Sequence, residues 1–312
     1  DCGTDLSVRD QLSKGAGGIA SKLGTGAASA MLSGLRLLPP EGFASTVEKL
    51  GGALGPLLPR NQVALDNLRH AFPEKSLSEC RDIRRKMWKH LSRMVAESAQ
   101  AERSLDLSPD NVDGSRIKVR GSEHALALRD DGRPGLVFTA HMGSWELLPL
   151  AAARFGLDIT SLYRPPSITA FAKLGARARA RSSSALITSR AGAAYELASV
   201  LERGGHVGLL VDQKFTQRSK VRVTFFGRPV DANPLLAKLA RQFDCPVIGA
   251  RLVRLAEGGF YLDITEPLDL PRDGSGQINV QGATAQVTNI VEGWVREYPE
   301  QWLWLHKRWS LH

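Results

Sequence analysis

The 312-residue chain has little cysteine, and its histidines and carboxylates show no metal-binding spacing. Cys2, Cys80 and Cys245 are odd in number and far apart, which argues against a disulfide framework and a thiolate zinc site. A reducing compartment fits this usage. Because the carboxylates are scattered, we expect no divalent metal site. The first fourteen residues alternate polar and charged types, so we expect no signal peptide there.

A long apolar run is also missing. The longest uncharged stretch near the N-terminus is "LGTGAASAMLSGL", residues 23–35, and it is rich in Gly, Ala and Ser. A helix that spans a bilayer needs about 20 apolar residues. We therefore expect this stretch either to lie in a membrane interface or to pack as an internal helix. Residues 1–59 are predicted to form an N-terminal helical, membrane-associating segment, and residues 60–312 an α/β domain.

Positive charge is abundant, with 41 Lys and Arg against 32 Asp and Glu, a formal charge of +9. This excess indicates an anionic partner, which could be nucleic acid, acidic lipid, a phosphorylated substrate or an acidic carrier protein. A solvated basic surface without a specific partner is the alternative. A nucleic-acid-binding protein is disfavoured, because no recognised binding module is present.

From about residue 115, short apolar runs alternate with helical patterns. Such alternation predicts an α/β fold with a mostly parallel central sheet and helices on both faces, preceded by N-terminal helices. The expected strands are residues 135–140, 157–163, 185–189, 207–211, 245–253 and 260–265. The expected helices are residues 145–155, 167–181, 192–203, 233–243 and 281–298. Before them, Ser76 and Glu79 match a capping box that begins a further helix.

The segment "HMGSWE", residues 141–146, carries a candidate for acid–base chemistry. On one helix, His141 and Glu146 would be rotated about 140° apart and could not meet. They can meet if His141 ends a strand, Gly143 adopts an unusual backbone angle and Ser144 caps the helix that follows. Glu146 could then hold one ring nitrogen while the other accepts a proton. The alternative is a strand-end histidine beside an acid that complements a helix dipole.

The chain resembles the late acyltransferases of lipid A biosynthesis, a branch of the glycerolipid and lysophospholipid acyltransferases. "HMGSWE" fits their H-x4-D/E motif, "SLYRPP" (161–166) their second block and "GLLVDQK" (208–214) their third. "FFGRPVDANPLLAKLA" and "CPVIGARLVR" resemble the block that follows. "RNQVALDNLRHAFPEKS" (60–76) and "PEQWLWLHKRW" (299–309) are typical of the lipid A branch.

This resemblance implies transfer of an acyl chain from a thioester to a hydroxyl of a phosphorylated glycolipid. An imidazole suits a general base for a hydroxyl, so His141 would take the proton and Glu146 would orient the ring. Arg164 would bind a phosphate or carboxylate. Asp212 and Gln213 would bond acceptor hydroxyls or hold Arg164, unless they form a purely structural turn. No GxSxG elbow is present, which disfavours a double-displacement hydrolase.

The resemblance also implies the partners and the location. We expect no cofactor, with acyl carrier protein or coenzyme A delivering the acyl chain as co-substrate. The expected partners are acyl carrier protein, a lipid A precursor and an anionic membrane surface, at the cytoplasmic face of the cell inner membrane. A phosphatidylinositol mannoside or lysophospholipid acceptor, with an acyl-CoA donor, is the alternative. Trp302, Trp304 and Trp309 either contact the membrane interface or pack against the sheet.

Overall fold

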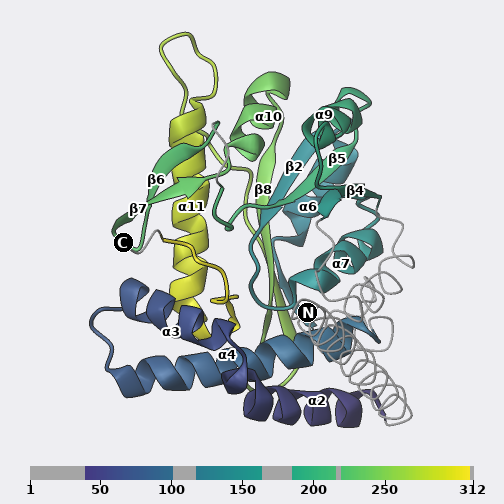
Figure 1. Ribbon diagram of the computed structural model, residues 1–312. Coiled ribbons are helices and arrows are strands. Elements are labelled where there is room, and N and C mark those ends of the chain that lie inside the picture. Colours follow the sequence, from purple (N-terminus) through teal and green to yellow (C-terminus); the bar gives the residue numbers. More distant parts are fainter. Residues whose placement is uncertain (1–38, 101–116, 164–184, 216–218, 310–312) are drawn as a thin grey trace, which may run out of the picture.

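A seven-stranded sheet forms the centre of the molecule (Figure 1). The computed structural model describes residues 39–100, 117–163, 185–215 and 219–309. The strand order is β1-β9-β8-β2-β5-β3-β4, and the β8–β9 pair is antiparallel while the other neighbours run parallel. The strands are β1 (Ile117–Arg120), β2 (Gly135–Thr139), β3 (Ile159–Tyr163), β4 (Leu186–Thr188), β5 (His206–Leu210), β8 (Val247–Arg254) and β9 (Phe260–Ile264).

Helices cover both faces of this sheet, as the alternating sequence pattern predicts. Phe138, Val207 and Val247 face one side, where they share a buried cluster with residues of the first group of helices. Val137 and Ile248 face the other side and pack with the second group. The first group is α9 (Ala193–Glu202), α10 (Leu235–Phe243) and α11 (Val280–Glu297), and the second is α6 (Ser122–Asp130) and α7 (Leu148–Arg154).

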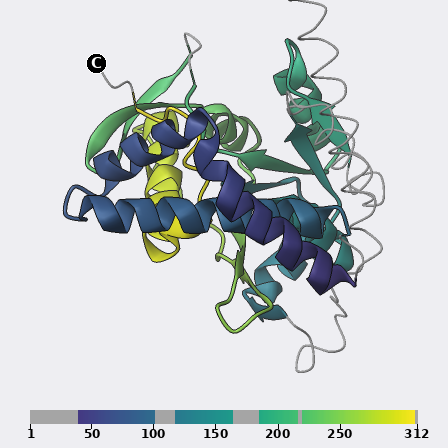
Figure 2. The same cartoon turned by 60° about the horizontal axis from the view of Figure 1, so that its bottom comes forward.

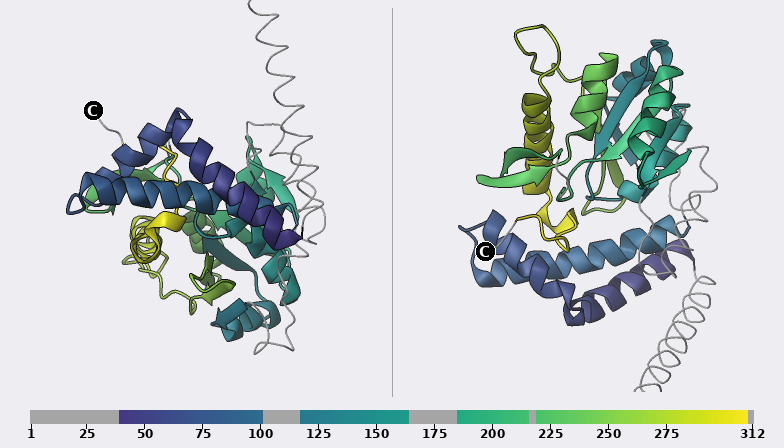
Figure 3. Two further views of the ribbon diagram at one scale, coloured as in Figure 1. Left: turned by 90° about the horizontal axis from the view of Figure 1, so that it is seen from below. Right: turned by 45° about the horizontal axis from the view of Figure 1, so that its top comes forward.

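The N-terminal helices form a layer across one end of the sheet, as Figure 2 and the right-hand view of Figure 3 show. They are α2 (Pro40–Leu54), α3 (Arg60–Ala71) and α4 (Leu77–Ser98), with the short helix η1 (Gly55–Leu57) between the first two. The predicted capping box begins α4: the Ser76 hydroxyl accepts from the Glu79 backbone, and the Glu79 carboxylate accepts from the Ser76 backbone. The expected boundary between residues 59 and 60 falls inside this layer.

The sequence pattern missed several elements. Strand β1 and helix α6 precede the first predicted strand, and a separate hairpin, β6 (Val221–Phe225) and β7 (Arg228–Ala232), packs along α11 (Figure 1). The hairpin alternates charged and apolar residues, and its turn places Phe226 and Gly227 at positive φ. The helix expected over residues 167–181 and the apolar stretch 23–35 lie outside the described residues.

The C-terminal aromatic residues belong to the core. Trp302, Trp304 and Trp309 are at most 3% exposed, which decides between the two expected environments in favour of packing. Asn67 of α3 holds this segment by donating to the backbone carbonyls of Trp304 and His306, at 2.7 Å and 2.6 Å. The segment therefore runs between the helical layer and the sheet in a fixed position.

Candidate active site

The loop that follows β2 carries the histidine. Gly143 has φ of +57°, and a Cβ atom there would lie 2.1 Å from the Leu252 carbonyl oxygen, so the expected unusual backbone angle is confirmed. The Ser144 backbone N–H donates to that carbonyl at 2.6 Å, while its side chain makes no cap hydrogen bond, contrary to expectation. The short helix η2 (Trp145–Leu147) then leads into α7.

His141 is held by Asp212. Its ring Nδ1 lies 2.8 Å from Oδ1 of Asp212, and its backbone N–H donates to Oδ2 at 3.0 Å. The indole N–H of Trp302 also donates to Oδ2, at 2.7 Å. The His141 side chain remains 15% exposed, whereas that of Asp212 is buried. A buried carboxylate thus fixes an imidazole that solvent can reach.

Asp212 is a buried carboxylate that stays ionised beside the ring. Burial raises the pKa of the Asp212 carboxyl, but the charge of His141 and hydrogen bonds from His141 and Trp302 outweigh it and lower this pKa to about 2. The carboxylate is therefore ionised at neutral pH and accepts the hydrogen on Nδ1 of His141. When the ring is neutral with its hydrogen on Nδ1, Nε2 carries a lone pair that can take a proton.

The parallel pairing of β2 with β5 brings the two residues together. Thr139 pairs with Leu210 at the last position of both strands. His141 and Asp212 each follow two residues later, so the same register places them side by side. The carboxyl ends of parallel strands are where open α/β sheets commonly place ligands.

Gln213 and His306 complete the polar side of the site. The Gln213 side-chain amide nitrogen lies 3.0 Å from Nε2 of His141 and 3.4 Å from Nε2 of His306. An amide that donates to Nε2 of His141 marks this nitrogen as the acceptor of the ring. A substrate hydroxyl that takes over this position would donate its hydrogen to the same lone pair.

Glu146 occupies a different position from the one expected. Both ring nitrogens of His141 contact other residues, Nδ1 the Asp212 carboxylate and Nε2 the Gln213 amide, so the carboxylate that orients the ring is Asp212. Glu146 lies in η2 and lines an apolar cleft beside Trp145. The local spacing in "HMGSWE" suggested the wrong partner, because the register of β2 with β5 places Asp212 at Nδ1 of the ring.

That cleft lies between the sheet and α7 and is open to solvent, with about 970 Å³ of empty space including its mouth. Its lining is almost entirely apolar and includes Val137, Ala151 and Ile159, and Gly208 leaves room on the sheet surface. Trp145 lines the cleft and also packs edge-on against the His141 ring, with centroids 5.5 Å apart. The cleft therefore begins next to the imidazole and runs along the sheet below α7.

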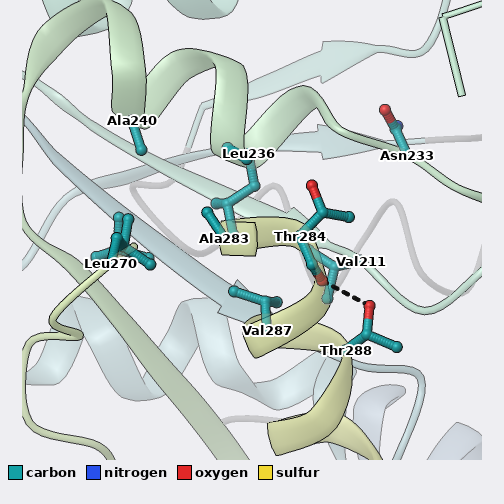
Figure 4. Close-up of a pocket in the computed structure, with 11 residues that line it drawn as sticks. Val211, Asn233, Leu236, Ala240, Leu270, Ala283, Thr284, Val287 and Thr288 are labelled. Carbon is teal, nitrogen blue, oxygen red and sulfur yellow. Dashed lines mark hydrogen bonds between the residues drawn. The ribbon is translucent and has the colours of Figure 1, made fainter. Parts of the chain in front are cut away.

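A second, much narrower pocket lies on the opposite face of the sheet between α10 and α11 (Figure 4). Leu236, Ala283 and Val287 line it, and the hydroxyl of Thr288 is already used in a bond to the Thr284 carbonyl at 2.8 Å. No ionisable side chain lines this cavity. It offers no group for acid–base chemistry.

The structure brings together His141, Asp212 and Gln213 among the predicted site residues, and it places Glu146 at the cleft. Arg164 lies outside the described residues. Sequence reasoning missed Trp302 and His306 as site residues. Both residues lie in the tail "PEQWLWLHKRW", whose resemblance to the family could have drawn attention to them. Their contacts, however, depend on the path of the chain past β2 and β5.

The chain is similar to known acyltransferases. Residues 20–310 match the sequence family of the bacterial lipid A biosynthesis acyltransferases. The chain is 24% identical over 266 residues to the lipid A biosynthesis palmitoleoyltransferase of Escherichia coli (strain K12) and to the lipid A biosynthesis acyltransferase of Shigella flexneri, with 83% of this chain and 82% of each relative covered. A solved structure, the 1-acyl-sn-glycerophosphate acyltransferase PlsC of Thermotoga maritima, matches at 15% identity and a TM-score of 0.38, covering 83% of this chain and 98% of that one.

Proposed function

This chain belongs to the bacterial lipid A biosynthesis acyltransferases, and from that membership we propose that it moves a fatty acyl chain from acyl carrier protein to a hydroxyl of a lipid A precursor. The observation that carries the proposal is the His141 ring, fixed by the buried Asp212 carboxylate at 2.8 Å and adjoining an apolar cleft. One side of the ring offers a base and the other a place for a hydrocarbon chain.

In the proposed reaction, the acceptor hydroxyl replaces the Gln213 amide at Nε2 of His141 and gives its proton to that nitrogen. The hydroxyl oxygen attacks the thioester carbonyl, and a tetrahedral intermediate forms. The carbon–sulfur bond then breaks, and the imidazolium returns the proton to the leaving thiolate. Asp212 stabilises the imidazolium during this sequence, as the acid does in a serine–histidine–acid triad. No acyl-enzyme is needed, because the acceptor itself attacks.

The cleft is the proposed site of the acyl chain. Its lining is apolar from Trp145, beside the imidazole, to Val137, Leu157 and Ile264 on the sheet and its flanking loop. An acyl chain buried there gains about 0.8 kcal/mol for each methylene group removed from water. With the chain in the cleft, its thioester end would lie at Trp145 and His141. Glu146, the one charged residue among those that line the cleft, is proposed to act on the substrate side of the site.

Membrane association is proposed to use the turn between α2 and α3. Leu54, Leu57 and Leu58 are 57%, 78% and 50% exposed, and Lys49 and Arg60 flank them. Exposed leucines beside cations suit the interface of an anionic bilayer. Among the described residues, no helix combines the length and the apolar character that crossing a bilayer requires. The formal charge of +9 also favours binding to an anionic bilayer, to a phosphorylated acceptor and to an acidic carrier protein.

The test is acylation of defined lipids by the purified full chain, followed by mass spectrometry. The acceptors are a phosphorylated lipid A precursor, a lysophospholipid and a phosphatidylinositol mannoside, each offered with acyl carrier protein thioesters and with acyl-CoA. We expect one acyl chain to be added to the lipid A precursor from the carrier protein, and none by His141→Ala. Transfer to another acceptor alone, or full activity of His141→Ala, would contradict the proposal.

A further inference from the structure

The backbone of Gly143, two residues after the histidine, is held at both its N–H and its carbonyl. Its N–H donates to the Gln301 carbonyl at 2.9 Å. Its carbonyl oxygen lies 3.0 Å from Nε2 of His90, a side chain of α4. His90 therefore links the N-terminal helical layer directly to the loop that carries His141.

The state of His90 makes this link a donor. Burial lowers the pKa of His90 to about 4. The hydrogen bond to Gly143 raises this pKa, whereas the charges of Arg254 and Arg93 lower it further. The ring is therefore neutral at pH 7. A carbonyl oxygen can only accept, so Nε2 carries the hydrogen of the neutral ring and donates it to Gly143.

A series of hydrogen bonds connects Gln301, which binds the Gly143 N–H, back to α4. The Gln301 side chain bonds the backbone of Arg254 in both directions, at 2.9 Å and 2.8 Å. The Arg254 guanidinium bonds Glu97, which also accepts from Arg93 at 2.9 Å. Glu97, Arg93 and His90 all belong to α4, so this series of hydrogen bonds ends on the same helix that binds the Gly143 carbonyl.

We infer that His90 is a positioning residue for the catalytic loop. It sets the direction of the Gly143 carbonyl, and through the two peptide bonds that link Gly143 to His141 it sets the place of the His141 ring against the cleft. A catalytic group displaced by about 1 Å can lose 10²-fold in rate. A residue that only stabilises the fold would change the melting temperature and leave the turnover of the folded enzyme unchanged. The inference rests on the proposed function only where turnover is measured.

The variants are His90→Leu, which removes the donor, and His90→Gln, which restores an N–H near the position of Nε2. The matched control is Met87→Ala, a buried residue of the same helix whose side chain packs in the main core and makes no hydrogen bond to Gly143. Amide hydrogen exchange of Gly143 and Ser144 is the first readout. We expect exchange at these amides to become at least about tenfold faster in His90→Leu, to stay close to wild type in His90→Gln and to change little in Met87→Ala.

The second readout is kcat, well below the melting temperature of each variant. We expect His90→Leu to lower kcat about 10- to 100-fold with the KM for the acyl donor changed less than about threefold, and His90→Gln to recover most of it. Unchanged exchange and unchanged kcat in His90→Leu would overturn the inference, as would an equal loss in Met87→Ala. If the wild type itself transfers no acyl chain, the proposed function fails while the exchange result still decides the role of His90.

Discussion

The two sides of the His141 ring are built on different principles. On one side, Asp212 and Gln213 contact the ring through hydrogen bonds of 2.8 Å and 3.0 Å, and Trp302 holds the carboxylate. On the other side, Trp145 contacts the ring by packing, and an apolar cleft of about 970 Å³ lies beyond it. The polar side fixes the direction of a proton transfer, and the apolar side leaves space for a chain. Substitutions on the two sides should therefore change different kinetic quantities.

On the polar side, Trp302→Phe should lower kcat about tenfold and leave the preference for acyl-chain length unchanged. The substitution keeps the packing of a large aromatic ring but removes the N–H that bonds Oδ2 of Asp212, and a hydrogen bond to a charged group contributes about 1.5–3 kcal/mol. Steady-state kinetics with a series of acyl donors measure both quantities. A change in chain preference with kcat unchanged would mean that the two sides are not separate.

On the apolar side, Gly208→Ala and Gly208→Val should favour progressively shorter acyl chains. A Cβ atom at Gly208 would lie 2.8 Å from Cγ2 of Ile159, so added atoms narrow the cleft. Each methylene that no longer fits loses about 0.8 kcal/mol, roughly a fourfold change in relative kcat/KM. Competition between donors of different length, read by mass spectrometry, gives this ratio. Ala198→Val adds two carbon atoms to α9, in the buried cluster on the opposite face of the sheet, and should lower stability without changing the ratio.

The smallest expected effect concerns the helix that supports the loop. His90 has a pKa of about 4 in the folded state and about 6.5 in the unfolded chain, so the unfolded chain binds more protons between these pH values. Its contribution to stability is complete above about pH 6.5 and is lost as the pH falls toward 4. Urea denaturation at pH 7, 5.5 and 4.5 should show that the free energy of unfolding falls more steeply with decreasing pH for wild type than for His90→Gln. Equal slopes would mean that His90 is already charged in the fold.

The fold was largely predictable because its strands are short apolar runs between helical patterns. The segment "GLVFTA" and the segment "VGLLV" became β2 and β5 with boundaries within one residue or so of those expected. The hairpin of β6 and β7 was missed because charged residues such as Arg222 and Arg228 interrupt it, and its pairing partner is only itself. A hairpin with only one buried face lacks the continuous apolar run that marks a parallel strand buried on both faces.

The site was predictable in its members and not in its pairing. His141 and Asp212 could each be recognised at the end of an apolar run, yet their contact follows from the order of strands in the sheet, which one sequence does not reveal. Glu146 was the nearer carboxylate along the chain and was therefore taken as the partner. The contribution of Trp302 depends on a tail that is distant in sequence, and no local pattern connects it to Asp212.

The central claim is that Asp212 orients the general base, and the turnover of Asp212→Asn measured beside that of Glu146→Gln tests it most directly. Asparagine keeps the shape of the side chain but can present an N–H to Nδ1, which disfavours the tautomer with a free lone pair on Nε2. We expect Asp212→Asn to fold normally and to lose about 10³- to 10⁴-fold in kcat. An Asp212→Asn enzyme with wild-type kcat, alongside an inactive Glu146→Gln, would contradict it and return the orienting role to Glu146.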